Sequence, residues 1–418
     1  MIIRNVTVVD GTGGAPLSDV EVVVSEGRFT AIRPTTGEGP SIDGRGGYLV
    51  PGLWEGHTHL AGVHTRDIPE SERVQHISRL LSDYLAAGIT SVVDLGGSLD
   101  VALEIRDYRR TATDPAATLF FAGRLFTGVK GWPVLDDTER AAIAFQVDDP
   151  GLAHQQALAL ADQVDFIKCV YDGEPGAPDK LSFDALRAIV AAGHEKGKKV
   201  LVHVHRRRDV EEAVAAGADG IEHAFLPQDA GSTQEAVDIA ALLAESNTYY
   251  CPTLVTWEQI GRNGDASYLD ELAKDGILTA ADIPRIAGSA WYGRPFRRHP
   301  AQESRVRLDY AMRTLGLMHE AGVKIAAGSD IAILMPSAPI ALFRELQLLA
   351  KAGLPLRAVL AAGTRHVAEK IGQGAHAGTI RPGAVADALL LSADPRTDLA
   401  HLISPAHRVW TLRGGRML

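Results

Sequence analysis

The amino-acid sequence predicts an α/β protein built on a (β/α)8 barrel, with a smaller β domain made from both ends of the chain. Eight short β-rich runs alternate with longer helical patterns after residue 51, and such alternation is typical of a parallel barrel. The runs are almost continuously apolar, as strands covered on both faces are. The two chain ends instead contain short strands and turns.

The β domain is expected to comprise residues 1–51 and 372–418. Turn pairs such as Asp10-Gly11 and Pro51-Gly52 separate its strands. The predicted strands are Ile2–Val9, Val20–Val24, Phe29–Ile32, Tyr48–Val50, Gly378–Ile380, Ala388–Leu391 and His407–Leu412. Since both ends contribute strands, we expect them to pair with each other.

The barrel is expected to span residues 52–371. Glycines 88, 217 and 322 lie one to three residues before predicted strands, where glycine can adopt the left-handed conformation that ends a helix. The connection over about residues 256–323 is unusually long, which favours a lid or an interface element. The eight predicted strands are Gly52–His59, Ile89–Leu95, Thr118–Phe126, Val164–Tyr171, Lys199–His205, Gly220–Phe225, Thr248–Leu254 and Lys324–Asp330.

Composition excludes several classes of protein. Hydrophobic residues make up 46% and charged residues 22% of the 418 residues, so a disordered chain is excluded. The net charge of −10 disfavours binding to nucleic acid or to an anionic membrane. The only cysteines, Cys169 and Cys251, form no cluster. This fits a reducing cytoplasm and argues against a metal site built from cysteine thiolates.

The chain shows no apolar run of the roughly 20 residues that a membrane span needs, and no signal pattern at its N-terminus. We therefore expect a cytoplasmic protein that acts on a small molecule. The sequence leaves the oligomeric state open, including a homo-oligomer.

A His-x-His pair, His57 and His59, ends the first predicted barrel strand. Residues two apart on a strand point to the same side, so both imidazoles can reach one metal ion. The pair alone would fit two ordinary loop residues equally well, because two histidines do not complete a metal site.

Further polar residues lie at or near the ends of other predicted strands. The carboxyl ends of barrel strands meet on one face, where barrel active sites lie. Nitrogen and carboxylate ligands suit zinc, with manganese or cobalt as alternatives. The six candidate metal ligands are His57, His59, Lys168, His203, His223 and Asp330.

Lys168 is an unusual member of this set, because a protonated amine has no lone pair to offer a metal. Burial could remove its proton. Alternatively, the amine could react with CO2 to give a carbamate, an anionic ligand with two oxygens that can bridge two ions.

The order of these residues on successive strands resembles the amidohydrolase superfamily in its two-metal form with a carboxylated lysine. Four further segments resemble the branch of imidazolonepropionase-related hydrolases and Xaa-Pro dipeptidases. These are Val50-Pro51-Gly52-Leu53, Ala86-Ala87-Gly88-Ile89-Thr90, Gly220-Ile221-Glu222-His223 and the region from Gly378 to Asp387.

The resemblance implies a TIM barrel beside a small β-sandwich formed by both chain ends. It also implies two divalent ions, most simply zinc, joined by the carbamate of Lys168. His57, His59, Lys168 and Asp330 would hold one ion, while Lys168, His203 and His223 would hold the other. The ions would activate a bridging hydroxide that attacks the carbonyl of a C–N bond.

Asp330 is expected to act as base and then acid, and His205 to steady the oxyanion. Candidate substrate contacts are Trp132, where the family often has histidine, Tyr171 and Arg206. One arginine of the groups 206–208 and 294–298 is a candidate clamp for a substrate carboxylate. The alternatives are a core or supporting role for His205, structural packing for Tyr171, and a solvated surface or interface salt bridges for the arginines.

The predicted function is therefore hydrolysis of the C–N bond in a small amide, such as a dipeptide, an N-acyl amino acid or a cyclic amide. One alternative is a one-metal deaminase or an imidazolone-type ring hydrolase, against which Lys168 argues. A second alternative is a barrel that binds without catalysing, although no candidate ligand is missing.

Overall fold

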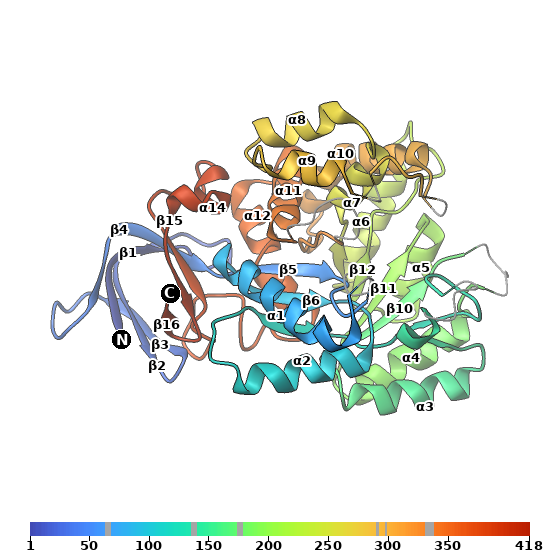
Figure 1. Cartoon of the computed structure of the whole chain (residues 1–418), viewed down its shortest axis with the longest axis horizontal. Coiled ribbons are helices and arrows are strands. Elements are labelled where there is room, and N and C mark those ends of the chain that lie inside the picture. Colours follow the sequence, from blue (N-terminus) through green and yellow to red (C-terminus); the bar gives the residue numbers. More distant parts are fainter. Residues whose placement is uncertain (63–67, 135–139, 174–178, 290–291, 297–298, 331–337) are drawn as a thin grey trace.

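Parallel strands lie at the centre of the larger part of the molecule and helices surround them (Figure 1). The structure is a computed structural model that describes residues 1–62, 68–134, 140–173, 179–289, 292–296, 299–330 and 338–418. The predicted α/β class with parallel strands is confirmed.

The central strands form two parallel sheets. The first has the order β5-β6-β7 and the second the order β13-β12-β11-β10-β8-β9. Their bounds are β5 (Leu53–Thr58), β6 (Ile89–Asp94), β7 (Thr118–Phe121), β8 (Leu125–Thr127), β9 (Ala144–Gln146), β10 (Ile167–Tyr171), β11 (Val200–Val204), β12 (Gly220–Glu222) and β13 (Tyr249–Cys251). Almost every residue of β5, β6, β10 and β11 is buried, which explains their continuous apolar character.

Two predicted strands differ from the structure. The run Thr118–Phe126 is divided into β7 and β8 at Gly123, whose φ of 61° interrupts an extended backbone. The run Lys324–Asp330 forms only an isolated bridge between Tyr250 and Ile325. Its backbone nevertheless bonds to both neighbours, since Ala326 N donates to Tyr250 O and Asp330 N donates to His57 O, each at 2.8 Å.

Helices follow the strands and cover them. Several helices begin at a side chain that caps a free backbone N–H group: Ser98, Asp149 and Ser182 each accept a hydrogen bond from the N–H three residues further on. The helices are α1 (Glu70–Ala86), α2 (Leu99–Thr111), α3 (Pro150–Ala161), α4 (Phe183–Glu195), α5 (Arg207–Ala215), α6 (Gln234–Ser246), α7 (Leu254–Gly261), α8 (Ala266–Lys274), α9 (Asp282–Ala287), α10 (Ala301–Glu320), α11 (Ala338–Lys351), α12 (Leu356–Ala362), α13 (Arg365–Lys370) and α14 (Ala400–Ile403), with short 3-10 helices at Arg140–Ile143 and Pro405–His407.

The described part of the long connection before residue 323 consists of helices joined by turns and irregular segments. It contains most of α7 and all of α8, α9 and α10, which lie together at the top of Figure 1. Among the described residues, no helix is both long and apolar enough to cross a lipid bilayer.

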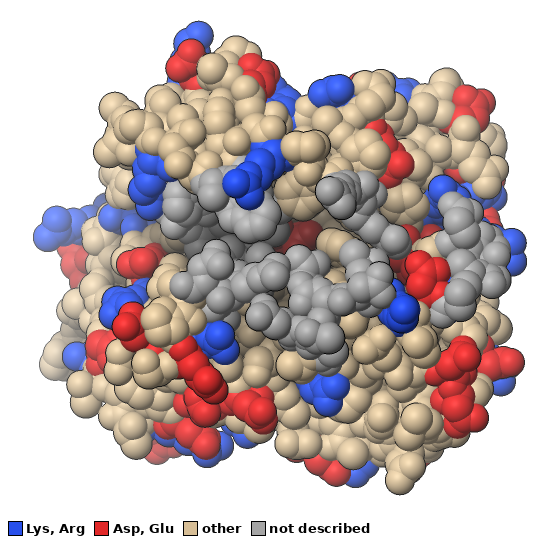
Figure 2. Space-filling model, turned by 45° about the vertical axis from the view of Figure 1, so that its right-hand side comes forward, with Lys and Arg blue, Asp and Glu red and all other residues tan. Residues whose placement is uncertain are grey.

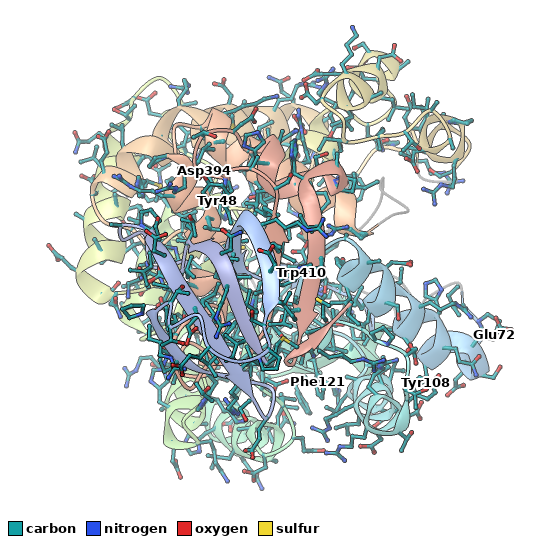
Figure 3. The ribbon with its side chains drawn as sticks, turned by 90° about the vertical axis from the view of Figure 1, so that its left-hand side faces the viewer. Tyr48, Glu72, Tyr108, Phe121, Asp394 and Trp410 are labelled. Atoms are coloured by element: carbon teal, nitrogen blue, oxygen red, sulfur yellow. The ribbon has the colours of Figure 1, made fainter. Side chains whose placement is uncertain are left out.

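Strands from both chain ends form one seven-stranded sheet, with the order β16-β15-β14-β4-β1-β2-β3. The predicted pairing of the two ends is confirmed, because β14 lies antiparallel to β4 with Leu391 opposite Tyr48. The strands are β1 (Ile2–Val8), β2 (Leu17–Ser25), β3 (Arg28–Pro34), β4 (Ile42–Pro51), β14 (Ala388–Leu391), β15 (Arg408–Arg413) and β16 (Arg416–Met417). Figure 3 views this sheet, with Tyr48 and Trp410 labelled.

This sheet differs in two respects from the expected sandwich. Its seven strands are continuous rather than divided into two sheets. The predicted strand Gly378–Ile380 is irregular, and Ile380 N donates to Asp10 O at 3.1 Å. An apolar cluster that includes Ile3, Phe29 and Leu390 gives this sheet a core separate from that of the barrel strands.

Acidic and basic side chains alternate over the described surface of the face in Figure 2. Neither sign covers an extended area of that view. This face includes the ends of β10, β11 and β12, on the right of Figure 1.

Candidate metal centre

The strand ends bring the predicted ligands together. His57 lies within β5, Lys168 within β10 and His203 within β11, whereas His223 directly follows β12. His57 and Lys168 are 0% and 1% exposed, and His203 and His223 are also buried. The sixth residue, Asp330, ends the segment that lies beside β5.

Asp330 lies at the meeting point of three histidines. Its Oδ1 is 3.6 Å from His57 Nε2 and 3.5 Å from His59 Nε2, and its Oδ2 is 3.8 Å from His223 Nδ1. The His223 ring is in turn 4.3 Å from the ring of His203, measured between centroids. The structure therefore places His57, His59 and His223 around one carboxylate, with His203 beside His223.

Lys168 lies in the same group. Burial lowers the pKa of its amine to about 8, although the nearby carboxylates of Glu222 and Asp330 oppose this shift. Burial and then the charge of Lys168 lower the pKa of His57. An amine with a reduced pKa loses its proton more readily, and only the neutral amine can bind a metal or react with CO2.

Two buried nitrogens in this group have no hydrogen-bond partner among the described residues. They are His57 Nε2 and Lys168 Nζ. His203 Nε2 is also without a hydrogen bond, although it lies 3.4 Å from Asp172 Oδ2. Buried polar atoms are normally satisfied, so this donor set fits divalent ions that would bind these atoms.

The second nitrogen of three histidines is held by the protein. His57 Nδ1 donates to Glu222 Oε2 at 2.7 Å, and His59 Nδ1 donates to Gly96 O at 2.8 Å. His223 Nδ1 lies 2.9 Å from Thr253 Oγ1. Metal-binding histidines usually have such a bond, because it fixes the tautomer and the orientation of the ring.

Glu222 is part of a buried charge network that sequence reasoning missed. Its other oxygen, Oε1, accepts a hydrogen bond from Lys370 Nζ at 2.6 Å. The three hydrogen-bonded side chains, those of His57, Glu222 and Lys370, are fully buried. In the sequence, the only indication of Glu222 is that it directly precedes His223. Neighbouring residues on a strand point to opposite sides, so this position does not by itself predict a contact with His57.

Glu55 binds two backbone segments of the same region. Its Oε1 accepts from the backbone N–H groups of His57 at 3.1 Å and of Ser329 at 2.8 Å. Burial raises the pKa of Glu55 to about 7. Glu55 thereby ties the ligand-bearing strand β5 to the segment that carries Asp330.

Three residues of the site have left-handed backbones. The φ angles are 79° at His223, 49° at Thr253 and 45° at Asp330. Such angles cost on the order of 1–3 kcal/mol each in residues other than glycine. Backbone bonds oppose this strain, since His223 N donates to Cys251 O and Asp330 N donates to His57 O, both at 2.8 Å.

His205 lies just beyond β11, next to a second polar group. Its Nδ1 accepts a hydrogen bond from Arg307 Nη2 at 2.8 Å, and its Nε2 is 3.4 Å from Glu303 Oε1. Burial and the charge of Arg307 lower the pKa of His205 to about 3. His205 is therefore neutral near pH 7 and carries its proton on Nε2.

His205, His299 and Glu303 present ligand-type atoms within 4.8 Å of one another. Arg307 donates to both His205 and Glu303, the latter at 3.3 Å. A cation at this group would meet the guanidinium charge, which disfavours a further metal site here.

The predicted substrate contacts lie in different surroundings. The half-buried ring of Trp132 is 6.1 Å from that of His299, between centroids. The Tyr171 hydroxyl donates to Glu212 Oε2 at 2.7 Å, and Lys180 Nζ lies 4.1 Å from its ring centroid. Arg206 precedes α5, and its backbone N–H donates to Asp209 Oδ2 at 2.8 Å.

The candidate arginine clamps have acidic partners or are exposed. Arg207 contacts Glu211 at 2.7 Å, and Arg208 contacts Glu212 at 2.7 Å. Arg294 is exposed. Arg297 and Arg298 lie outside the described residues.

An α/β fold with imidazole, amine and carboxylate groups gathered near the ends of parallel strands defines the class of this protein: α/β enzymes whose active site lies at the strand ends. The Amidohydrolase family model matches residues 48–418. The chain therefore belongs to the Amidohydrolase family, and it is a hydrolase that acts on C–N bonds.

Similar proteins span almost the whole chain. Ochratoxinase from Aspergillus niger is 24% identical over 408 residues, covering 88% of this chain and 75% of that protein. Its crystal structure superposes with a TM-score of 0.74 at 19% identity, covering 100% of this chain and 95% of the other.

Two further solved structures have the same fold. A Xaa-Pro dipeptidase with bound methionine in the active site gives a TM-score of 0.75 at 18% identity, covering 100% of this chain and 99% of the other. Phenylurea hydrolase B gives 0.73 at 20% identity, covering 100% and 96%.

Proposed function

We propose that this enzyme hydrolyses the C–N bond of a small amide, such as a dipeptide, an N-acyl amino acid or a cyclic amide, with the help of two divalent ions. The observation that carries the proposal is the pair of buried, unpartnered nitrogens, His57 Nε2 and Lys168 Nζ, beside Asp330. The names ochratoxinase and Xaa-Pro dipeptidase support cleavage of amide bonds. We assign the chain to the imidazolonepropionase-related and Xaa-Pro dipeptidase-like branch.

In this proposal His57, His59, Lys168 and Asp330 hold one ion, and Lys168, His203 and His223 hold the other. Zinc suits these nitrogen and oxygen donors best. Lys168 binds both ions as a carbamate, which the lowered pKa of its amine favours. Hydrogen bonds from the segment 324–330 to Tyr250 of β13 and His57 of β5 support a closed barrel in this proposal.

When bound, the ions would lower the pKa of a water molecule and polarise the carbonyl group of the amide. Asp330 takes a proton from that water and delivers it to the leaving nitrogen. Burial raises the pKa of Asp330 to about 7, so its carboxyl group can exchange a proton near neutral pH. His205, with its proton on Nε2, can donate to the developing oxyanion.

Other side chains would shape the substrate pocket. Trp132 provides an aromatic wall, and Arg206 and Tyr171 are further candidate contacts. The bond from Tyr171 to Glu212 favours a structural role for the tyrosine, because it occupies the hydroxyl group.

Two measurements test the proposal. Protein purified without chelator should contain close to two divalent ions per chain by elemental analysis. The metal-reconstituted enzyme should hydrolyse at least one class in a panel of dipeptides, N-acyl amino acids and lactams. Full activity with one ion would favour the one-metal deaminase or ring hydrolase, whereas metal-free protein without any hydrolysis would favour a binding scaffold.

A further inference from the structure

Arg307 is a buried cation that lies beside the metal centre. It belongs to α10, within the long insertion, and its side chain is 1% exposed. Its Cζ lies 4.0 Å from the centroid of the Trp257 ring. The ring of Trp257 is in turn 5.9 Å from that of His223, so a single aromatic ring separates the guanidinium from a proposed metal ligand.

Among the described residues, only Nη2 of the guanidinium has hydrogen-bond partners. Nη2 donates to His205 Nδ1 at 2.8 Å and to Glu303 Oε1 at 3.3 Å. Nε and Nη1 are buried and have no hydrogen-bond partner among the described residues. Buried N–H groups of a charged side chain are costly to leave unpaired, so these two donors point to a ligand that accepts hydrogen bonds.

The charge at this position persists at neutral pH. Burial lowers the pKa of Arg307 to about 10, while Glu303 and Asp172 oppose the shift. An acceptor for Nε and Nη1 would therefore meet a full positive charge. A carboxylate is the acceptor that best matches a guanidinium in both charge and shape.

The surroundings describe the remainder of the ligand. The ring of His299 lies 5.2 Å from that of Trp257 and 6.1 Å from that of Trp132, between centroids. Aromatic side chains of this kind bind apolar groups by their faces and edges. The position thus combines one fixed cation with an aromatic lining, next to the centre that would cleave the amide.

We propose that Arg307 binds a carboxylate of the substrate, so that the amides this enzyme cleaves carry a free carboxylate close to the scissile C–N bond and an apolar side chain. This inference rests on the proposed function, since it assigns the substrate of the same site. It replaces the candidates among residues 206–208 and 294–298 with a residue outside both groups.

A purely structural ion pair with Glu303 is the competing explanation. Glu303 accepts from Nη2 at 3.3 Å, a bond that leaves Nε and Nη1 without a partner among the described residues, and the Glu303 side chain is 27% exposed. If the ion pair were purely structural, the affinity for a ligand would not depend on whether the ligand carries a carboxylate. The two explanations therefore differ in a measurable preference.

The test compares ligands that differ only by a carboxylate. Zinc-loaded enzyme is titrated calorimetrically with L-phenylalanine and phenethylamine, and with L-leucine and 3-methylbutylamine. These molecules are the amine products of amide hydrolysis, with and without the carboxylate, and they are not turned over. The variants are Arg307→Gln, which removes the charge, and Arg307→Lys, which keeps it.

We expect the wild type to prefer each amino acid over its amine by about 10–100-fold, the range of a charge-assisted bond. Arg307→Gln should abolish the preference and Arg307→Lys should keep part of it. The control Arg313→Gln removes an exposed arginine of the same helix, which pairs with Asp309, and should keep the wild-type ratio. Zinc content and melting temperature identify a variant that has lost its fold.

Hydrolysis separates this inference from the proposed function. If the wild type cleaves small amides but binds both members of each pair equally, or if a folded Arg307→Gln keeps the preference, the carboxylate assignment is wrong and the proposed function stands. If the preference depends on Arg307 but no amide in the panel is cleaved, the carboxylate site stands and the proposed function is wrong.

Discussion

Glu222 Oε2 lies 2.7 Å from His57 Nδ1, and both side chains are fully buried. The bond joins residues 165 positions apart in the chain. It fixes the proton of His57 on Nδ1 and leaves Nε2 free to bind an ion. On the other side, Lys370 Nζ donates to Glu222 at 2.6 Å, so a side chain of α13 helps to orient a proposed metal ligand of β5.

The first prediction follows from this network. Glu222→Gln should weaken zinc binding by about 10–100-fold, because glutamine can accept the bond from His57 but lacks the charge. It should also lower the free energy of unfolding by about 3–5 kcal/mol, because Lys370 becomes an unpaired buried charge. Chelator competition and urea denaturation measure the two effects.

The double variant Glu222→Gln/Lys370→Met separates them. Removing both charges should restore much of the stability, whereas zinc affinity should stay low. Recovery of zinc affinity together with stability would show that Glu222 acts through folding alone and does not tune His57.

The second prediction concerns the bridging ligand. Lys168→Ala should lower kcat at least about 100-fold and reduce the zinc content, because it removes a donor shared by both ions. Acetate or formate should partly restore turnover by taking the place of the carbamate. Lys198→Ala is the matched control, since Lys198 bonds to Val164 O at 2.7 Å and lies outside the candidate site. Normal turnover with two zinc ions in Lys168→Ala would contradict the carbamate assignment.

Asp330→Asn should separate chemistry from binding. Asparagine tolerates the left-handed backbone at this position, where φ is 45°, and it retains an oxygen for the ion. It cannot take a proton from water, so kcat should fall about 10²–10⁴-fold. KM should change little, and most of the zinc should remain by elemental analysis. A rise in KM with an unchanged kcat would assign Asp330 to substrate binding instead.

The candidate ligands could be predicted from sequence because they are a local pattern repeated along the chain. His57 and His203 lie near the ends of apolar runs and Lys168 lies within one, and the parallel arrangement of the strands brings these positions together. The segment after residue 323 also showed this pattern but forms no regular strand. There Ser329 N donates to the side chain of Glu55, which replaces the backbone partner that a strand would supply.

Other parts of the site depend on contacts that no local pattern encodes. Lys370 lies 148 positions from Glu222, and Arg307 lies 102 positions from His205. Both look in sequence like ordinary surface charges of a helix, where Lys and Arg are most common. Only the packing of α13 and α10 against the strand ends shows that these two cations are buried.

The last prediction concerns the pH dependence of stability. Glu345 in α11 is 0% exposed, and its Oε2 accepts from Val255 N at 2.8 Å. Burial raises its pKa from 4.5 to about 8. Between these two pH values the folded protein binds one more proton here than the unfolded chain, so this group reduces the stability as the pH rises.

Glu345→Gln keeps an acceptor for Val255 and removes the titration. The stability of the variant relative to wild type should therefore increase by on the order of 1–3 kcal/mol from pH 6 to pH 8, as measured by urea denaturation of metal-free protein. Glu21→Gln is the control, because hydrogen bonds from Arg4 and Arg33 lower the pKa of Glu21 to about 2. Its charge is the same in folded and unfolded chains above pH 6, so its difference from wild type should stay constant there. A constant difference for Glu345→Gln as well would mean that Glu345 is ionised in the folded protein and that its negative charge is stabilised within the core.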